Sequence, residues 1–302
     1  MREFLDLDEV LDFCKALSSP IRMEIIKILK ENRMLNLNEL ATALNVTNGA
    51  ITSHIKILDQ AGLIEVEHSA GIRGIQKNCI LKETKFLINL ADEYSRNNTY
   101  QVELPVGSYN DFSVWPTCGL ATKSQLIGEV DDKRYFDDPL RREAAILWFS
   151  KGHISYRIPN YLKPQSKIEE LQVSFEISSE APGICEDYPS DIQFYLNDVY
   201  LGYWTSPGDF GEVKGLYTPE WWFPNWNQYG LLKMITISKD GVYLDGRKIS
   251  DVTIDSFHLD HESDLVFRFA VDEKSENVGG LTLFGKGFGN YNQDINARII
   301  YY

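Results

Sequence analysis

Residues 36–62 read NLNELATALNVTNGAITSHIKILDQAG, and this stretch decides the fold of the amino-terminal part of the chain. Asn36 and Glu39 have the spacing of a capping box, which predicts the start of a short helix. Thr47 is placed to cap a second helix, and Gly62 supplies the left-handed residue that ends it. The second helix has one apolar face, formed by Ile51, Ile55 and Leu58. Two helices joined by a tight turn at residues 45–47 predict a helix-turn-helix.

The flanking sequence adds further elements to this core. Upstream, a helix is predicted to begin with Ser19 as N-cap and Pro20 at the first helical position, where its missing N–H costs nothing. Downstream, residues 63–67 and 75–81 predict two strands around a glycine-containing tip at 69–74, a β-hairpin wing. A last amphipathic helix is predicted from the spacing of Phe86, Leu87, Leu90, Ala91 and Tyr94. Its apolar stripe is too long for so small a domain to cover, so we expect a partner subunit to cover it.

The polar face of the second helix of the motif has the residue types that major-groove recognition requires. Small and hydrogen-bonding side chains let a helix backbone approach the bases. The candidate DNA-binding residues of this helix are Thr47, Asn48, Gly49, Thr52, Ser53, His54 and Lys56. Arg73 at the wing tip adds a basic side chain that could enter a minor groove. The alternative is that these residues form only a solvated helix face.

The stretch from Lys15 to Leu81 resembles the winged-helix DNA-binding domain of the ArsR/SmtB family of bacterial repressors. The resemblance covers roughly the first third of the chain and follows the order of elements from the amino-terminal helix to the wing. It implies a homodimeric transcriptional regulator, more specifically a repressor, whose partner is a double-stranded DNA operator. We expect its two recognition helices to dock in successive major grooves, about 34 Å apart.

Many relatives in this family sense metal ions, and this sequence departs from both of their common sites. The segment 36–40 contains no cysteine, and residues 82–97 contain Asp92 and Glu93 but no histidine. Cys14 and Cys79 are expected to be buried thiols rather than ligands. We therefore expect no metal and no cofactor, and a metal sensor is a less favoured alternative.

Charge and composition bound the possible classes of protein. A length of 302 residues predicts two domains. The net charge of -14 divides into -2 for residues 1–100 and -12 for residues 101–302, so only the first part remains a candidate for phosphate contact. No apolar run reaches membrane-spanning length, and the amino terminus lacks the basic and apolar order of a signal peptide. The four scattered cysteines are typical of a reducing compartment, so we expect a cytoplasmic protein with free thiols and no membrane partner.

From about Asn97 the sequence changes to short β-rich runs separated by turns. Hairpin turns are predicted at Asn197-Asp198 and at Asp240-Gly241. We expect residues 1–97 to form the winged helix-turn-helix and dimerisation domain, residues 98–139 a linker and packing segment, and residues 140–302 a β-sandwich or jelly roll. The predicted class is thus an α+β multidomain protein.

Four of the six tryptophans lie in two loops of the β region. Indole faces stack on sugar rings, and amides and carboxylates beside them bind hydroxyl groups. The candidate ligand-binding residues are Trp204, Asp209, Trp221, Trp222, Asn225, Trp226 and Tyr229. The region vaguely resembles a carbohydrate-binding module, which implies a sugar effector. The alternatives are that these tryptophans fill the core or an interface, or that the β domain is a protein-interaction or dimerisation module.

The sequence offers no catalytic residues. It contains neither a G-x-S-x-G nor an H-E-x-x-H motif. The carboxylate pair of a glycan hydrolase is defined by its separation in space, which a sequence does not give. We therefore expect a protein that is not an enzyme, with glycan hydrolysis as a less favoured alternative.

Overall fold

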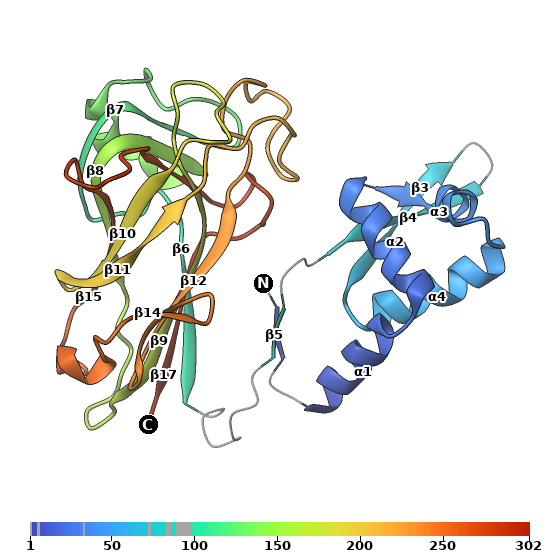
Figure 1. Ribbon diagram of the computed structural model, residues 1–302, viewed down its shortest axis with the longest axis horizontal. Helices are drawn as coiled ribbons and strands as arrows, with labels where there is room; N and C mark the ends of the chain where they lie inside the picture. The colour runs from blue at the N-terminus through green and yellow to red at the C-terminus, as the bar shows by residue number, and fades with distance from the viewer. Residues whose placement is uncertain (1, 5–6, 33, 72–73, 83–85, 89–97) are drawn as a thin grey trace. The chain divides into compact units, whose positions relative to one another are not determined.

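The computed structural model describes residues 1–302 except 1, 5–6, 33, 72–73, 83–85 and 89–97. The chain divides into two compact units, Met1–Glu93 and Tyr94–Tyr302. The helices belong to the first unit and the second is built from strands, as Figure 1 shows. This division agrees with the predicted α+β multidomain class.

The described residues of the first unit form four helices around a small apolar core. Buried Ile25, Leu40, Ile51 and Leu58 bring α2, α3 and α4 together. The strands β2, β3 and β4 form a three-stranded sheet in the order β2-β4-β3. The described elements are α1 Leu7–Leu17, α2 Pro20–Glu31, β2 Leu35–Asn36, α3 Leu37–Leu44, α4 Asn48–Gln60, β3 Ile64–Gly71 and β4 Gly74–Leu81.

The helix boundaries follow the predicted local signals closely. The Asn36 side chain accepts the backbone N–H groups of Asn38 and Glu39, and the Glu39 carboxylate accepts the N–H of Asn36 at 2.7 Å, so the capping box is complete. Thr47 caps α4, and Gly62 follows that helix with φ 71°. Ser19 is an exception, because its side chain makes no cap hydrogen bond, although Pro20 opens α2 as expected.

The predicted last helix is wrong where the structure describes it. Residues Phe86–Ile88 form a strand, β5, which pairs in parallel with β1, Arg2–Phe4. The rings of Phe4 and Phe86 each pack against Phe13 of α1, with centroids 4.6 Å apart in both pairs. This contact between distant segments favours an extended backbone where the local spacing predicted a helix. Leu90, Ala91 and Tyr94 of the predicted helix lie outside the described residues.

The second unit consists of twelve strands in one sheet, in which the strand pairs are antiparallel. Its 3-10 turns are η2 Lys133–Asp137, η3 Pro139–Glu143 and η4 Ile254–Phe257. The strands are β6 Thr99–Leu104, β7 Asp111–Ala121, β8 Ile146–Ile158, β9 Ile168–Ser178, β10 Ser190–Leu196, β11 Val199–Ser206, β12 Leu231–Ser238, β13 Gly241–Leu244, β14 Arg247–Ser250, β15 Leu265–Val271, β16 Leu281–Phe284 and β17 Ile295–Tyr301.

The sheet curls until the strands at its two ends meet. The long strand β8 pairs with β7, β15 and β16, and β9 pairs with β12, β16 and β17. The end strands β11 and β14 lie against each other, where Gly202 leaves room for the side chain of Ile249. The predicted all-β second domain is therefore confirmed as a large antiparallel, nearly closed sheet. Both predicted hairpins are present, as β10–β11 and β12–β13.

Residues 98–139, expected to be a linker and packing segment, are an integral part of this sheet. Strand β6 pairs with β17, and β7 pairs with β8 along most of its length. Tyr109 and Phe136, which lie between or after these strands, are almost fully buried in the core. The linker prediction is wrong because the partners of β6 and β7 come from later in the chain.

No helix in the described parts of the chain is both long and apolar enough to cross a membrane.

Candidate nucleic-acid interface and ligand cavity

Helices α3 and α4 are held together by polar as well as apolar contacts. The amide Nδ2 of Asn48, at the start of α4, donates to Oδ1 of Asn38 on α3 at 2.8 Å. Asn45 ends α3 in the left-handed conformation, with φ 52° and ψ 46°, which makes the turn tight. Asn38 was not among the predicted residues. Asn48, predicted to contact DNA, is also a positioning residue that links the two helices.

The exposed face of α4 carries most of the predicted DNA-binding residues. Thr47, Asn48, Gly49, Thr52, Ser53 and Lys56 are exposed, whereas Ile51, Ile55 and Leu58 are buried. The Thr52 hydroxyl donates to the Asn48 carbonyl oxygen at 2.7 Å, and the Ser53 hydroxyl donates to that of Gly49 at 3.2 Å. Both hydroxyl oxygens remain able to accept a hydrogen bond. A Cβ atom on Gly49 would meet nothing within 4 Å, so the backbone is open to close approach there.

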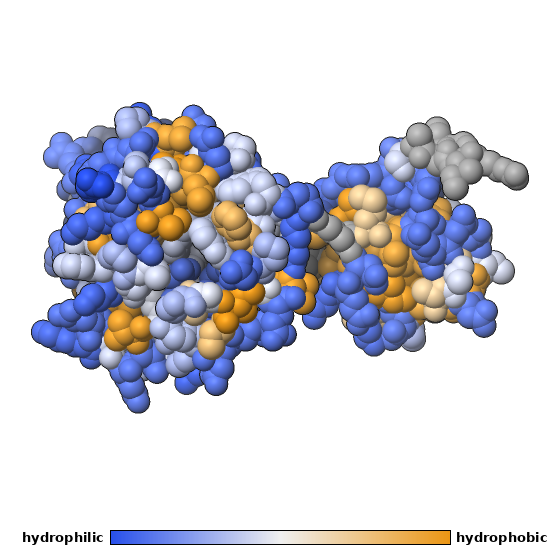
Figure 2. All heavy atoms as spheres, turned by 90° about the horizontal axis from the view of Figure 1, so that it is seen from above, coloured by the Kyte–Doolittle hydropathy of each residue, from blue (hydrophilic) through white to orange (hydrophobic). Residues whose placement is uncertain are grey.

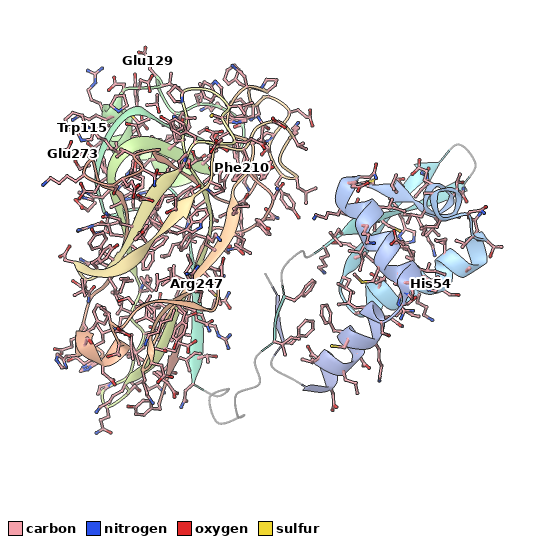
Figure 3. The ribbon with its side chains drawn as sticks, viewed as in Figure 1. His54, Trp115, Glu129, Phe210, Arg247 and Glu273 are labelled. Atoms are coloured by element: carbon pink, nitrogen blue, oxygen red, sulfur yellow. The ribbon has the colours of Figure 1, made fainter. Side chains whose placement is uncertain are left out.

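Two predicted DNA-binding residues differ from this group. His54 is labelled on α4 in Figure 3 and is half-buried, and among the described residues no hydrogen-bond partner is present for its shielded Nδ1 atom. Arg73, at the predicted wing tip, lies outside the described residues. Among the predicted DNA-binding residues that the structure describes, Lys56 is therefore the exposed basic side chain.

The cysteines of the first unit have different surroundings. Cys79 on β4 is fully buried, and burial raises the pKa of its thiol to about 11. Cys14 on α1 is exposed, so its prediction as a buried thiol is wrong: it lies on the solvent side of an amphipathic helix whose buried side carries Phe13. In the described residues, no three His, Cys, Asp or Glu side chains come together as metal ligands.

Three of the predicted ligand-binding residues meet around one cavity in the second unit. Asp209, Trp222 and Trp226 line a cavity of about 150 Å³. Trp148 of β8, Glu180 after β9 and Asn227 line it too, and none of these was predicted. Trp148 belongs to a continuous apolar run in the sequence, which predicts only a buried strand.

The other predicted ligand residues lie elsewhere or serve the structure. Trp221 lies beside Trp222 and donates its indole N–H to the Lys123 carbonyl oxygen at 2.6 Å. Trp204 packs on the main core, with Lys233 Nζ 4.6 Å from its ring centroid. Tyr229 stacks on Phe210 at 5.2 Å, and Asn225 is exposed. Trp204, Trp221, Asn225 and Tyr229 are not among the residues that line the cavity.

A buried carboxylate fixes the loop that carries the tryptophans. Glu176 of β9 is fully buried and accepts the backbone N–H groups of Gly230, Asn290 and Tyr291 at 2.8–2.9 Å. These bonds connect the end of the loop 207–230 and the segment before β17 to strand β9. One end of the loop that carries Trp222 and Trp226 is therefore anchored to β9 by hydrogen bonds.

The cavity contains carboxyl groups that are held away from water. Asp209 is 1% exposed, and burial raises its pKa to about 7, although the N–H of Ala181 donates to Oδ2 at 3.0 Å and opposes the shift. Burial also raises the pKa of Glu180 well above its usual range, and the nearby Asp209 adds to this effect. The Thr282 hydroxyl donates to Glu180 at 2.7 Å.

The raised pKa of Asp209 predicts that Asp209→Asn stabilises the protein at alkaline pH. Between pH 4 and 7 the unfolded chain releases this proton while the folded chain keeps it, so the free energy of unfolding falls as pH rises. Three pKa units correspond to about 4 kcal/mol, and allowing for solvent in the cavity we expect a gain of about 2 kcal/mol at pH 8 and almost none at pH 4. Urea unfolding at both pH values measures it, with Asp255→Asn, an exposed carboxyl on η4, as control. An equal effect at both pH values would contradict the prediction.

A second, more open groove of about 430 Å³ lies over β7, β8, β10 and β15. It contains Trp115, which is 49% exposed and has Lys133 Nζ 4.8 Å from its ring centroid. Trp115 and Glu273 are labelled on this part of the unit in Figure 3. Trp115 was not among the predicted site residues, although the alternation around buried Val114 places it on the outer face of the sheet.

The α3–α4 pair with the β3–β4 hairpin defines the class of the first unit, a winged helix-turn-helix domain. Residues 19–66 match the profile of the bacterial regulatory protein, arsR family, so this part of the chain is similar to the helix-turn-helix domain of that family. The match ends within β3, before the second unit begins, so it says nothing of the second unit. No curated protein matches the chain.

Solved structures similar to this chain cover about a quarter of it. An ArsR family transcriptional regulator is 20% identical, over 27% of this chain and 76% of its own, with a TM-score of 0.22. HlyU from Vibrio cholerae is 23% identical, over 26% and 78%, with a TM-score of 0.23. A transcriptional regulator homologue from Pyrococcus horikoshii is 24% identical, over 24% and 75%, with a TM-score of 0.21.

Proposed function

We propose that this chain is a DNA-binding transcription regulator that acts as a homodimeric repressor in the cytoplasm. The observation that carries the proposal is the polar, exposed face of α4 in a helix-turn-helix of ArsR type. Thr52 and Ser53 lie one turn into the helix, where side chains of a recognition helix reach base edges. Lys56 and the backbone at Gly49 supply contacts to phosphate.

Exposed apolar side chains on the first unit support the proposed dimer. Leu11 of α1 is 51% exposed and Ile88 of β5 is 40% exposed. Figure 2 shows apolar surface on the smaller unit, at the right of the view. Apolar side chains on a small domain are favourable at a subunit interface, where a second copy removes them from water.

We further propose that the second unit, whose curled sheet we assign to the sandwich or jelly-roll class, senses a small ligand. The cavity around Trp222 and Asp209 supports this role, because it combines aromatic walls with a few polar groups. A ligand changes DNA affinity only by its differential affinity for two arrangements of the protein, typically about 1–3 kcal/mol.

Selection from random duplex DNA by the full-length protein tests the regulator proposal. We expect enrichment of two similar half-sites whose centres are about 10 base pairs or a multiple apart. Affinity for the enriched duplex is expected to exceed that for random DNA by at least 10³-fold at physiological salt. Recovery of unrelated duplexes with equal affinity would contradict it.

A further inference from the structure

The cavity between Trp148, Trp222 and Trp226 is acidic as well as aromatic. Three carboxyl side chains line it, those of Asp131, Glu180 and Asp209. No lysine, arginine or histidine is among the described residues that line it. Asp131 is exposed, whereas Asp209 and Glu180 are shielded from water and their pKa values are raised. A cation beside these two side chains would favour their ionised forms, so the wall favours a positively charged occupant.

The described part of the cavity wall contains buried oxygen atoms that accept no hydrogen bond. Within the described part of the chain, Oδ1 of Asp209 and Oδ1 of Asn227 have no hydrogen-bond partner, although the two residues are only 1% and 5% exposed. Neighbouring donors are already in use. Asn227 Nδ2 donates to Ser178 Oγ at 2.6 Å, and the Trp222 indole N–H donates to the backbone carbonyl oxygen of Asn227 at 3.0 Å. These two oxygens, Oδ1 of Asp209 and Oδ1 of Asn227, can accept a hydroxyl proton of a ligand or the polarised C–H groups beside a cationic nitrogen.

The three indole rings pack edge to face on one another and form one aromatic cluster in the cavity wall. Trp222 meets Trp226 at 5.1 Å and 85°, and Trp148 meets Trp222 at 5.8 Å and 77°. Trp148 meets Trp226 at 5.6 Å and 66°. Rings this close contact one another directly, so the cavity lies beside the cluster and the rings present aromatic surface to it. Aromatic surface of this kind attracts quaternary ammonium groups. The volume of about 150 Å³ is that of a cavity that holds one benzene-sized group.

We propose that this cavity binds an organic ammonium ion, with the indole cluster against its alkyl groups and Asp209 and Glu180 as counter-charges. A neutral sugar fits less well, because each hydroxyl both donates and accepts and the wall has few free donors. The volume is also small for an oligosaccharide. This inference names the ligand class of the proposed sensor and rests on that proposal only for the step from ligand to DNA.

Calorimetric titration of the full-length protein with three probes tests the ligand class directly. The probes are choline, its neutral isostere 3,3-dimethylbutan-1-ol, and glucose. We expect choline to bind at least tenfold more tightly than the isostere and glucose, and more tightly at pH 8 than at pH 6 because the proton on Asp209 competes with the cation. The proposal is overturned if no probe binds, if the isostere binds as well as choline, or if glucose binds better.

Matched variants test whether the binding occurs in this cavity. Glu180→Gln keeps the shape and removes a carboxyl group that can ionise beside a cation, and Trp226→Phe keeps an aromatic ring, so each is expected to weaken choline binding at least fivefold. Trp115→Ala, in the separate open groove, serves as the control and is expected to bind choline normally. Loss of binding in Trp115→Ala alone would overturn the proposal. The melting temperature of each variant verifies its fold. The comparison of choline with its neutral isostere uses the unaltered protein and does not depend on any variant.

The same protein separates this proposal from the regulator proposal. Binding to the selected duplex is followed by fluorescence anisotropy, with and without choline. Choline binding without any specific DNA binding would reject the regulator and leave the ammonium site. Specific DNA binding without choline binding would reject the ammonium site and leave the regulator.

Discussion

Ser53→Glu is expected to weaken binding to the selected operator at least 100-fold while leaving the fold intact. Ser53 is exposed on α4, and its hydroxyl donates to the Gly49 carbonyl oxygen of the same helix. A carboxylate there faces the negative groove of the duplex and the acceptor edges of purines. An exposed substitution of this kind changes folding stability by only about 0.5 kcal/mol. Anisotropy titration with labelled operator measures the loss.

The control for Ser53→Glu adds the same charge elsewhere. Ser113 is exposed on β7 of the second unit, and Ser113→Glu is expected to change operator affinity less than threefold. Ser53→Ala removes the hydroxyl without adding charge and is expected to cost roughly tenfold or less. Operator binding by Ser53→Glu with nearly normal affinity would show that α4 is not the recognition helix.

The signals that predicted the first unit correctly are all local. The capping box needs only Asn36 and Glu39 three positions apart, and Gly62 ends α4 because its left-handed conformation favours a residue without Cβ. The β5 strand was missed because its structure depends on a parallel partner, β1, more than eighty residues away in sequence. Apolar spacing at 86–88 carries no information about that partner.

In the second unit, too, the local features could be predicted and the long-range strand pairings could not. Both short hairpins could be predicted, since Asn197 and Asp198 adopt positive φ angles that two-residue turns require. The strands β6 and β7 could not be assigned, because β6 finds its partner in β17 at the far end of the chain. The turn chemistry of a hairpin lies within a few residues, whereas the register of a closing strand depends on the whole sheet.

Only some of the residues that line the candidate cavity could be predicted, because several of the others come from distant strands. Clustering of tryptophans in the sequence pointed to Trp222 and Trp226, and both line the cavity with Asp209. Trp148 and Glu180 come from β8 and from the end of β9, and nothing local marks them as neighbours of that loop. Trp204 and Tyr229 share the composition of the cavity residues but pack elsewhere, so composition alone overestimated the site.

Trp222→Ala is expected to lower the free energy of unfolding by about 3–5 kcal/mol, the usual cost of truncating a buried tryptophan. Trp222 is 5% exposed, and its ring meets those of Phe288 and Trp226 at 4.9 and 5.1 Å. The alternatives of core and ligand site are therefore not exclusive here, because one side of the ring fills the core and the cavity lies beside it.

Urea unfolding followed by circular dichroism measures this loss without depending on tryptophan fluorescence. Trp226→Ala is the informative comparison, because Trp226 is half-buried and lines the same cavity. We expect it to cost clearly less stability, about 1–2 kcal/mol, because less area is buried. Choline binding is expected to be lost in both variants, and equal, small losses of stability would show that Trp222 is a surface residue of the site and not part of the core.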